Sequence, residues 1–117
     1  MPIFDLNSFR DERVLNLTTT GRQSGQPRTI EIWFVVYQQR CYLLAEHELQ
    51  AHWVQNILAH PHVSLQIKGV RFRGRARILD REQDHAEWLA VANCSRQKYG
   101  WGEGLPVAID TAPMEDG

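Results

Sequence analysis

The polar loop from Gly21 to Pro27 carries the residues of this chain best suited to binding an anion. Arg22 lies inside the loop and Arg28 follows it, so two guanidinium groups flank the hydroxyl of Ser24. Guanidinium groups, hydroxyls and free backbone N–H groups are the donors that hold phosphates and carboxylates. The pattern therefore predicts either an anion site or an ordinary solvated hairpin with arginines on its surface.

This loop differs from the common phosphate-binding motifs. Three residues separate Gly21 from Gly25 and a β-rich segment follows, whereas a P-loop has four residues between its glycines and opens a helix. No G-x-G-x-x-G segment leads into a helix elsewhere in the chain. An anion bound here would lie on a β-hairpin, which points away from the α/β nucleotide-binding folds.

The elements that position this loop follow from hydrophobic periodicity and turn residues. The alternating and β-branched segments predict six strands, over residues 14–20, 29–37, 41–45, 63–67, 71–79 and 105–109. Helical spacing and caps predict helices over residues 6–11, 49–58 and 80–97. Asp80 and Gln83 resemble a capping box at the start of the last helix. Hairpins with an inserted helix and a closing strand are typical of a mainly β fold, a small antiparallel barrel.

Length and composition predict one domain over residues 1–117. Residues 1–12 would hold a short N-terminal helix, and residues 111–117 a flexible tail. Cys41 and Cys94 lie far apart in an expected strand and an expected helix, which predicts reduced thiols and a cytoplasmic protein. No segment has a signal peptide's basic start or the apolar length of a membrane span. We therefore expect no membrane partner.

The net charge of −1 argues against general affinity for nucleic acid. Arginines nevertheless alternate with small and apolar residues along one expected strand, at Arg71, Arg73, Arg75 and Arg77. Such a stripe predicts either a solvated outer face of the sheet or the wall of an anion-binding groove.

Two motifs at a fixed separation resemble the deazaflavin-dependent nitroreductase family. They are Thr19-Thr-Gly-Arg-Gln-Ser-Gly-Gln-Pro-Arg28 and Ala51-His-Trp-Val-Gln-Asn-Ile-Leu-Ala-His-Pro61, and the similarity extends over about residues 14 to 80. This family is related to the FMN-binding pyridoxamine-phosphate-oxidase-like proteins. The resemblance implies a six-stranded antiparallel split β-barrel with two to three helices, a homodimer, and a groove for coenzyme F420 near the subunit interface.

The resemblance also implies a set of cofactor-binding residues. The expected set is Arg22, Gln23, Ser24, Gly25, Arg28, Trp33, Trp53 and Asn56. The hairpin residues match the motif that holds the anionic tail of the cofactor. Trp33 would flank the ring or pack in the core, Trp53 would pack or contact the ligand, and Asn56 would cap its helix or reach the cofactor.

Two departures from the family pattern bear on the cofactor. Gln23 stands where many members have Lys, and Glu46-His-Glu-Leu49 stands where Ser-Lys-Gly-Gly is usual. Carboxylates beside an anionic tail would weaken its binding, by about 1 kcal/mol each if partly exposed. Alternatively, Glu46 and Glu48 would pair with Arg22 or with the arginine after the loop when no ligand is bound.

The segment from Lys98 to Gly104 is a second candidate site, because its three glycines surround Tyr99 and Trp101. A mobile loop of this kind would lay its aromatic rings over a flat ligand, and the Tyr99 hydroxyl would act as the catalytic proton donor. The alternative is a chain corner packed by its own aromatic residues.

These observations favour an oxidoreductase that transfers hydride from reduced F420 to a small conjugated, quinone-like or nitroaromatic acceptor. The cofactor carries the hydride, so the protein needs no nucleophile or metal cluster. FMN in the same groove is the alternative among enzymes. A non-catalytic carrier or sensor of a flavin or haem also stays open, with His47 as the axial ligand in the haem case. No metal site is expected at the histidines.

Overall fold

The computed structural model describes residues 6–113. Seven strands are present, β1 (Leu15–Thr20), β2 (Pro27–Ile32), β3 (Val35–Tyr37), β4 (Arg40–Ala45), β5 (His62–Ile67), β6 (Val70–Ile78) and β7 (Leu105–Pro113). Two α-helices, α1 (His52–Ala59) and α2 (His85–Tyr99), and two 3₁₀ turns, η1 (Leu6–Phe9) and η2 (Glu48–Gln50), complete the described part of the chain. The protein is mainly β, as the sequence predicts.

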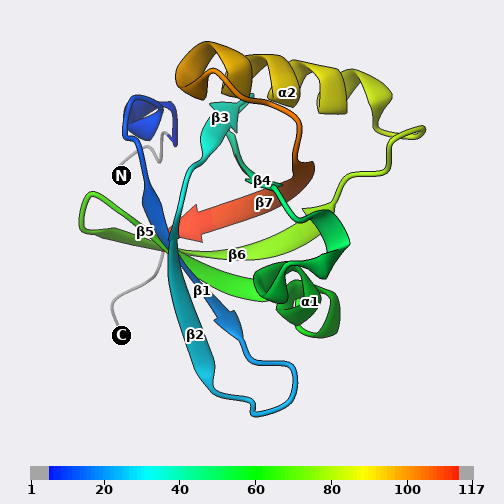
Figure 1. Cartoon of the computed structure of the whole chain (residues 1–117). Coiled ribbons are helices and arrows are strands. Elements are labelled where there is room, and N and C mark those ends of the chain that lie inside the picture. The colour runs from blue at the N-terminus through cyan, green and yellow to red at the C-terminus, as the bar shows by residue number, and fades with distance from the viewer. Residues whose placement is uncertain (1–5, 114–117) are drawn as a thin grey trace.

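All seven strands form one antiparallel sheet in the order β2-β1-β5-β6-β7-β4-β3. The two edge strands, β2 and β3, are consecutive in the chain and are joined through Trp33 and Phe34. The sheet must therefore curl until its edges approach each other, and Figure 1 shows this half-barrel. Curling of this kind is one way in which proteins limit the pairing of open sheet edges with other chains.

The strand count is seven instead of the expected six because the segment 29–37 is not one strand. β2 pairs only with β1, and β3 pairs only with β4 at the opposite edge. The backbone changes partners at Trp33 and Phe34, where Phe34 is buried in the core and Trp33 stays 48% exposed. Hydrophobic pattern alone does not reveal such a change, because both halves remain β-rich.

Two core clusters pack on the two faces of β4. Cys41 and Leu43 point into the interior of the half-barrel with η1, β1, β5, β6 and β7, whereas Tyr42 and Leu44 pack under α2. Figure 1 shows α2 lying across the β3–β4 end of the sheet and α1 beside the loop end of the β1–β2 hairpin. The two helices thus cover different ends of the barrel.

Several element ends differ from the sequence prediction. The Asp80 carboxylate accepts the N–H groups of Glu82 and Gln83, but this closes a turn, and α2 begins only at His85. The last strand continues to Pro113, so the expected tail from residue 111 was wrong for residues 111–113. The expected N-terminal helix is a 3₁₀ turn over Leu6–Phe9. The remainder of both terminal predictions, residues 1–5 and 114–117, lies outside the described residues.

No helix among residues 6–113 is long and apolar enough to cross a membrane. Cys41 and Cys94 are free thiols, and Cys41 lies fully buried in β4. Burial raises the pKa of the Cys41 thiol to about 12.

Candidate functional site

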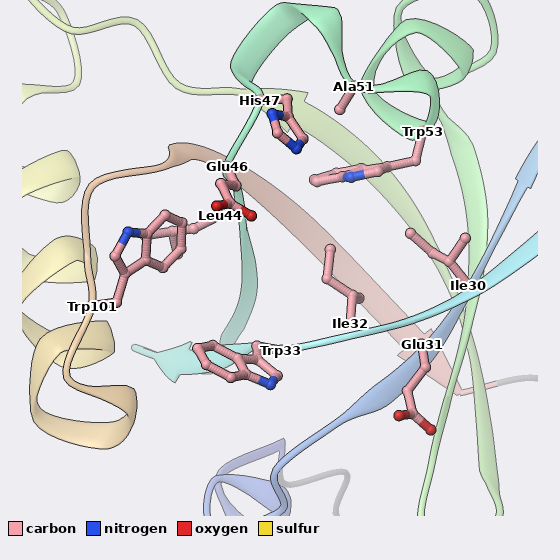
Figure 2. A pocket seen from close by; sticks show the side chains of 10 residues that line it. All are labelled: Ile30, Glu31, Ile32, Trp33, Leu44, Glu46, His47, Ala51, Trp53 and Trp101. Carbon is pink, nitrogen blue, oxygen red and sulfur yellow. The ribbon is translucent and has the colours of Figure 1, made fainter.

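A groove runs from the β1–β2 loop, past α1, to the corner that follows α2. It consists of two adjoining pockets that share Ile30 and Trp53 in their walls. We name the pocket at the loop, of about 660 Å³, the polar half, and the neighbouring pocket, of about 520 Å³, the aromatic half. Figure 2 shows the aromatic half with its lining side chains.

Asn56 ties the loop to α1 at the floor of the polar half. Its side chain is 95% buried, and its Oδ1 accepts from the Arg22 backbone N–H at 3.1 Å and from Arg22 Nη1 at 2.9 Å. Asn56 Nδ2 donates to Thr19 Oγ1 at 3.1 Å. The amide therefore connects β1, the loop and the helix, and every polar atom of its side chain has a protein partner.

Arg22 is held over α1 rather than paired with a carboxylate. Besides Asn56, its guanidinium contacts the His52 ring, with Nη2 3.2 Å from Nδ1. The expected pairing of Glu46 or Glu48 with the loop arginines is not observed among residues 6–113. The positive charge of Arg22 thus remains uncompensated beside the polar half.

The loop itself is fixed by short-range hydrogen bonds. Gly21 N–H donates to Gln26 O and Gly25 N–H donates to Gly21 O, each at 2.8 Å, while Ser24 Oγ accepts from the Gln26 N–H at 3.2 Å. Gly25 has a φ of 71°, which a residue without Cβ adopts at little cost. Within the described residues, the backbone N–H groups of Gln23 and Ser24 donate to no protein acceptor.

The second arginine of the loop motif, Arg28, is exposed and has no ion pair in the described part of the chain. A Cβ placed on Gly21 would lie 2.7 Å from Ser24 Oγ and 3.5 Å from Arg28 Nε. A side chain at Gly21 would therefore collide with the Ser24 hydroxyl, so the loop needs glycine at this position. Two cations, a hydroxyl and two free N–H groups consequently surround the polar half, and no carboxylate lines it.

The aromatic half has three tryptophans in its walls, Trp33, Trp53 and Trp101. Figure 2 shows their indole rings around a space whose floor is formed by Ile32 and whose far wall is formed by Ile30. Aromatic and aliphatic side chains in this arrangement suit a flat, conjugated ligand.

Tyr99 contacts the aromatic half through Trp33, which lines it. Its ring stacks on Trp33 with a centroid distance of 4.3 Å and an interplanar angle of 5°. The Arg13 guanidinium lies 4.6 Å from the centroid of the Tyr99 ring, within the range of a cation–π contact. The Tyr99 hydroxyl accepts from Phe34 N–H at 3.1 Å and lies 2.7 Å from Arg13 O and 2.9 Å from Phe34 O.

The proton-donor role expected for Tyr99 stays a prediction. Its hydroxyl is directed at backbone carbonyls, and its ring lies outside both halves of the groove. Burial raises the pKa of the Tyr99 phenol, which disfavours loss of its proton. Tyr99 thus stacks on Trp33, and together with Trp33 and Trp101 it lines a small cavity beside the aromatic half.

Lys98 reinforces the same support. Its Nζ donates to Phe34 O at 2.9 Å and lies 4.1 Å from the centroid of the Phe34 ring. Burial, and then the nearby charge of Arg13, lower the pKa of the Lys98 amine to about 8. The strand break at residues 33 and 34 is thus held by the end of α2.

The glycine-rich corner after α2 is packed. Gly100 ends the helix in the left-handed conformation, with φ 77°, and its N–H donates to Arg96 O at 2.8 Å. Gly102 is buried, and Ser95 Oγ donates to Trp101 O. The structure thus favours the packed corner over the mobile loop, and Trp101, absent from the expected binding set, is the aromatic residue of this segment that faces the groove.

The expected cofactor-binding residues divide between the two halves. The polar half is lined by Arg22, Gln23, Ser24, Arg28, Trp53 and Asn56, and the aromatic half by Trp33 and again Trp53. Gly25 shapes the loop without lining either half. Sequence reasoning did not place Ile30, Ile32 or Leu44 in the site, although the alternation of Ile30 and Ile32 indicates that they share one face of β2.

Glu46 and His47 also lie in the wall of the aromatic half, whereas Glu48 lines neither half. Figure 2 shows the Glu46 carboxylate and the His47 ring on the side of the pocket between Trp101 and Trp53. The carboxylates expected beside an anionic tail are therefore away from the polar half. No group of three His, Cys, Asp or Glu side chains that could hold a metal ion occurs among residues 6–113.

The arginine stripe of β6 lines neither half of the groove. Arg71, Arg73, Arg75 and Arg77 are all exposed, and Arg77 Nη1 pairs with Asp84 Oδ2 at 2.9 Å. Of the two interpretations of the stripe, the solvated outer face agrees with the structure.

Comparisons with known proteins agree with the fold. Residues 7–111 match the family model described as F420H2-dependent quinone reductase. A solved F420H2-dependent reductase is 22% identical, with a TM-score of 0.62 and coverage of 93% of this chain and 97% of that one. An FAD-binding protein from Mesorhizobium loti is 16% identical, with a TM-score of 0.69 and coverage of 93% and 86%. A haem storage protein from Vibrio cholerae is 21% identical, with a TM-score of 0.66 and coverage of 95% and 89%.

Proposed function

Since the chain belongs to the F420H2-dependent quinone reductase family, whose cofactor is coenzyme F420, we propose that this oxidoreductase reduces a small quinone-like or nitroaromatic acceptor by hydride transfer. The observation that supports the proposal is the division of the groove. Cations and hydrogen-bond donors gather in one half, and aromatic walls in the other.

The polar half fits the phosphodiester and oligoglutamate tail of the cofactor. Arg22 and Arg28 provide positive charge, and the free N–H groups of Gln23 and Ser24 provide donors at fixed positions. The Ser24 hydroxyl accepts from Gln26, so its own hydrogen is available to an anion. Charge-assisted hydrogen bonds of this kind are shorter and stronger than neutral ones.

The aromatic half fits the deazaflavin ring and the acceptor. When bound, the reduced ring supplies a hydride at carbon. Trp33, Trp53 and Trp101 would orient the two flat reactants and exclude water between them. Trp33 is well suited to this role, because its ring is fixed by stacking on Tyr99 while 48% of the residue remains exposed.

A fluorescence-polarisation titration with F420, with FMN as competitor, tests the cofactor and the site together. We expect micromolar or tighter F420 binding that FMN does not displace, because FMN has one phosphate and uses fewer donors of the polar half. Arg28→Ala should weaken F420 binding, and Arg71→Ala, on the outer face of β6, is the matched control. Displacement by FMN would instead favour the alternative cofactor.

Turnover completes the test. Menadione should be reduced in the presence of reduced F420, with the loss of cofactor absorbance recorded over time. Failure of both F420 binding and menadione reduction would contradict the proposal. A Soret band on addition of haem that is lost in His47→Ala would then favour a haem carrier, since His47 lines the aromatic half.

We further propose a homodimer whose subunit contact covers the mouth of the groove. Ile30 and Trp33 are exposed by 36% and 48%, and both lie in the groove wall. A second subunit over these residues would remove apolar surface from water. Light scattering after size exclusion should give twice the chain mass, and Trp33→Glu should shift the protein toward the monomer.

A further inference from the structure

The aromatic half carries negative charge and no permanent positive charge. Its ten lining residues include Glu31 and Glu46 but no Lys or Arg. The opposite holds in the polar half, which has two arginines and no carboxylate. A ligand that spans the groove therefore meets fields of opposite sign at its two ends.

Glu46 is the carboxylate that faces the ligand space. Figure 2 shows its oxygens turned toward the middle of the pocket, between Trp101 and the indole of Trp53, whereas the carboxylate of Glu31 points away. Within residues 6–113 the Glu46 side chain has no hydrogen bond and no ion pair, and it is exposed. Its charge is thus available to a ligand.

Tryptophan faces and a carboxylate are the two groups that attract an organic cation. The face of an indole ring is electronegative and binds cations, and a carboxylate adds a Coulomb attraction that is strengthened by the nearby apolar walls. An anionic ligand is repelled by the same groups, and a neutral quinone gains only the stacking. We propose that the aromatic half selects flat cationic acceptors, with Glu46 as the residue that determines this specificity.

The inference rests on the proposed function, and the chemistry of a cationic acceptor is compatible with it. In 10-methylacridinium, a new C–H bond forms at C9 with the hydride that reduced F420 supplies. The cationic ring is reduced to neutral 10-methylacridan, the cofactor is oxidised, and one proton leaves from the cofactor to solvent. No proton is added to the acceptor, whereas a quinone must also gain one. Reduction of this acceptor therefore needs no proton from the Tyr99 hydroxyl, which is directed at backbone carbonyls.

Binding without cofactor gives the primary test. The quenching of tryptophan emission is titrated with 10-methylacridinium and with anthracene-2-sulfonate, which are flat tricyclic ions of opposite charge. We expect the cation to bind about tenfold more tightly than the anion. Glu46→Gln should weaken binding of the cation about fivefold and leave that of the anion unchanged or stronger. Glu48→Gln, a nearby exposed carboxylate outside the groove, should change neither.

Turnover separates the inference from the function on which it rests. With reduced F420, the ratio of kcat/KM for 10-methylacridinium to that for menadione should fall about fivefold in Glu46→Gln, after subtraction of the uncatalysed rate. Equal binding of cation and anion, or a ratio that Glu46→Gln leaves unchanged, would overturn the inference while menadione reduction still upholds the proposed function. Loss of F420 binding and of menadione reduction in the wild type would instead contradict the proposed function.

Discussion

Replacing Asn56 with Ala should both destabilise the protein and weaken F420 binding, because one buried amide holds the loop on α1. The substitution removes the acceptor of two Arg22 hydrogen bonds and the partner of Thr19 Oγ1. The bond to the exposed guanidinium contributes about 0.5 to 1 kcal/mol. Each of the other two contributes about 1 kcal/mol, so the expected loss in the free energy of unfolding is about 2.5 to 3 kcal/mol.

The loss is measured by urea unfolding, and for a domain of this size it corresponds to a decrease in Tm of about 8 to 12 °C. F420 affinity, measured by fluorescence polarisation, should fall about tenfold, because the released loop must be ordered again on binding. Leu58→Ala is the control on the same helix, since Leu58 is 58% exposed and contributes to neither half of the groove.

Asn56→Asp separates the two effects. The carboxylate still accepts from both Arg22 donors, and the Thr19 hydroxyl can donate to it in place of the lost amide donor, so the free energy of unfolding should change by less than about 1 kcal/mol. Its charge neutralises Arg22 toward the ligand, and F420 binding should nevertheless weaken about tenfold. If the free energy of unfolding of Asn56→Ala lies within about 0.5 kcal/mol of the wild-type value, Asn56 does not hold the loop on α1. Wild-type F420 affinity in Asn56→Asp would refute the polar half as the tail site.

Three further predictions follow from the geometry. Arg28→Ala should weaken F420 binding about fivefold in the polarisation assay. The midpoint of urea unfolding should stay unchanged, because Arg28 is exposed and unpaired within the described residues. A lowered midpoint would show that Arg28 also stabilises the fold. Gly102→Ala should cost about 1 to 3 kcal/mol in thermal unfolding, because the added methyl overlaps the Ala92 carbonyl oxygen; an unchanged Tm would contradict the packed corner. Folding lowers the pKa of Lys98 to about 8 from its usual 10.5, through burial and then the charge of Arg13, so between these values the unfolded state binds more protons. The free energy of unfolding should therefore rise with pH from 8 to 10.5 more steeply in the wild type than in Lys98→Met, and equal slopes in urea titrations would exclude the shift.

Most of the fold was predictable because local patterns and topology agree. The Gly-containing and polar turns between consecutive strands predict that β1 pairs with β2, β3 with β4, and β5 with β6. The break at Trp33 and Phe34 was not predictable, since β-propensity does not tell which neighbour a strand pairs with. The strand partners are determined by burial of Phe34 and by the hydrogen bonds of Lys98 and Tyr99 to its backbone. These contacts join residues more than 60 positions apart in the sequence.

The site was predictable where it depends on a local motif. The polar half follows from the loop residues and the nearby helix, whereas the aromatic half is assembled from β2, β4, the residues that flank η2, α1 and the corner after α2. The sequence predicts that the Glu46 carboxylate weakens binding of the anionic cofactor tail, because sequence distance does not show which pocket a side chain enters. The sequence also does not show that Trp101 lines the aromatic half and Tyr99 does not, because the chain leaves the helix between them at Gly100.

The position of β4 in the sheet also determines when this strand can complete its pairing during synthesis of the chain. Its residues Cys41 to Ala45 are all buried, yet one edge of β4 pairs with β7, the last strand among residues 6–113. A nascent chain therefore carries an apolar strand with an open edge until β7 has left the ribosome. Truncations ahead of Leu105 should aggregate as released fragments, and slow translation late in the message should increase dependence on chaperones.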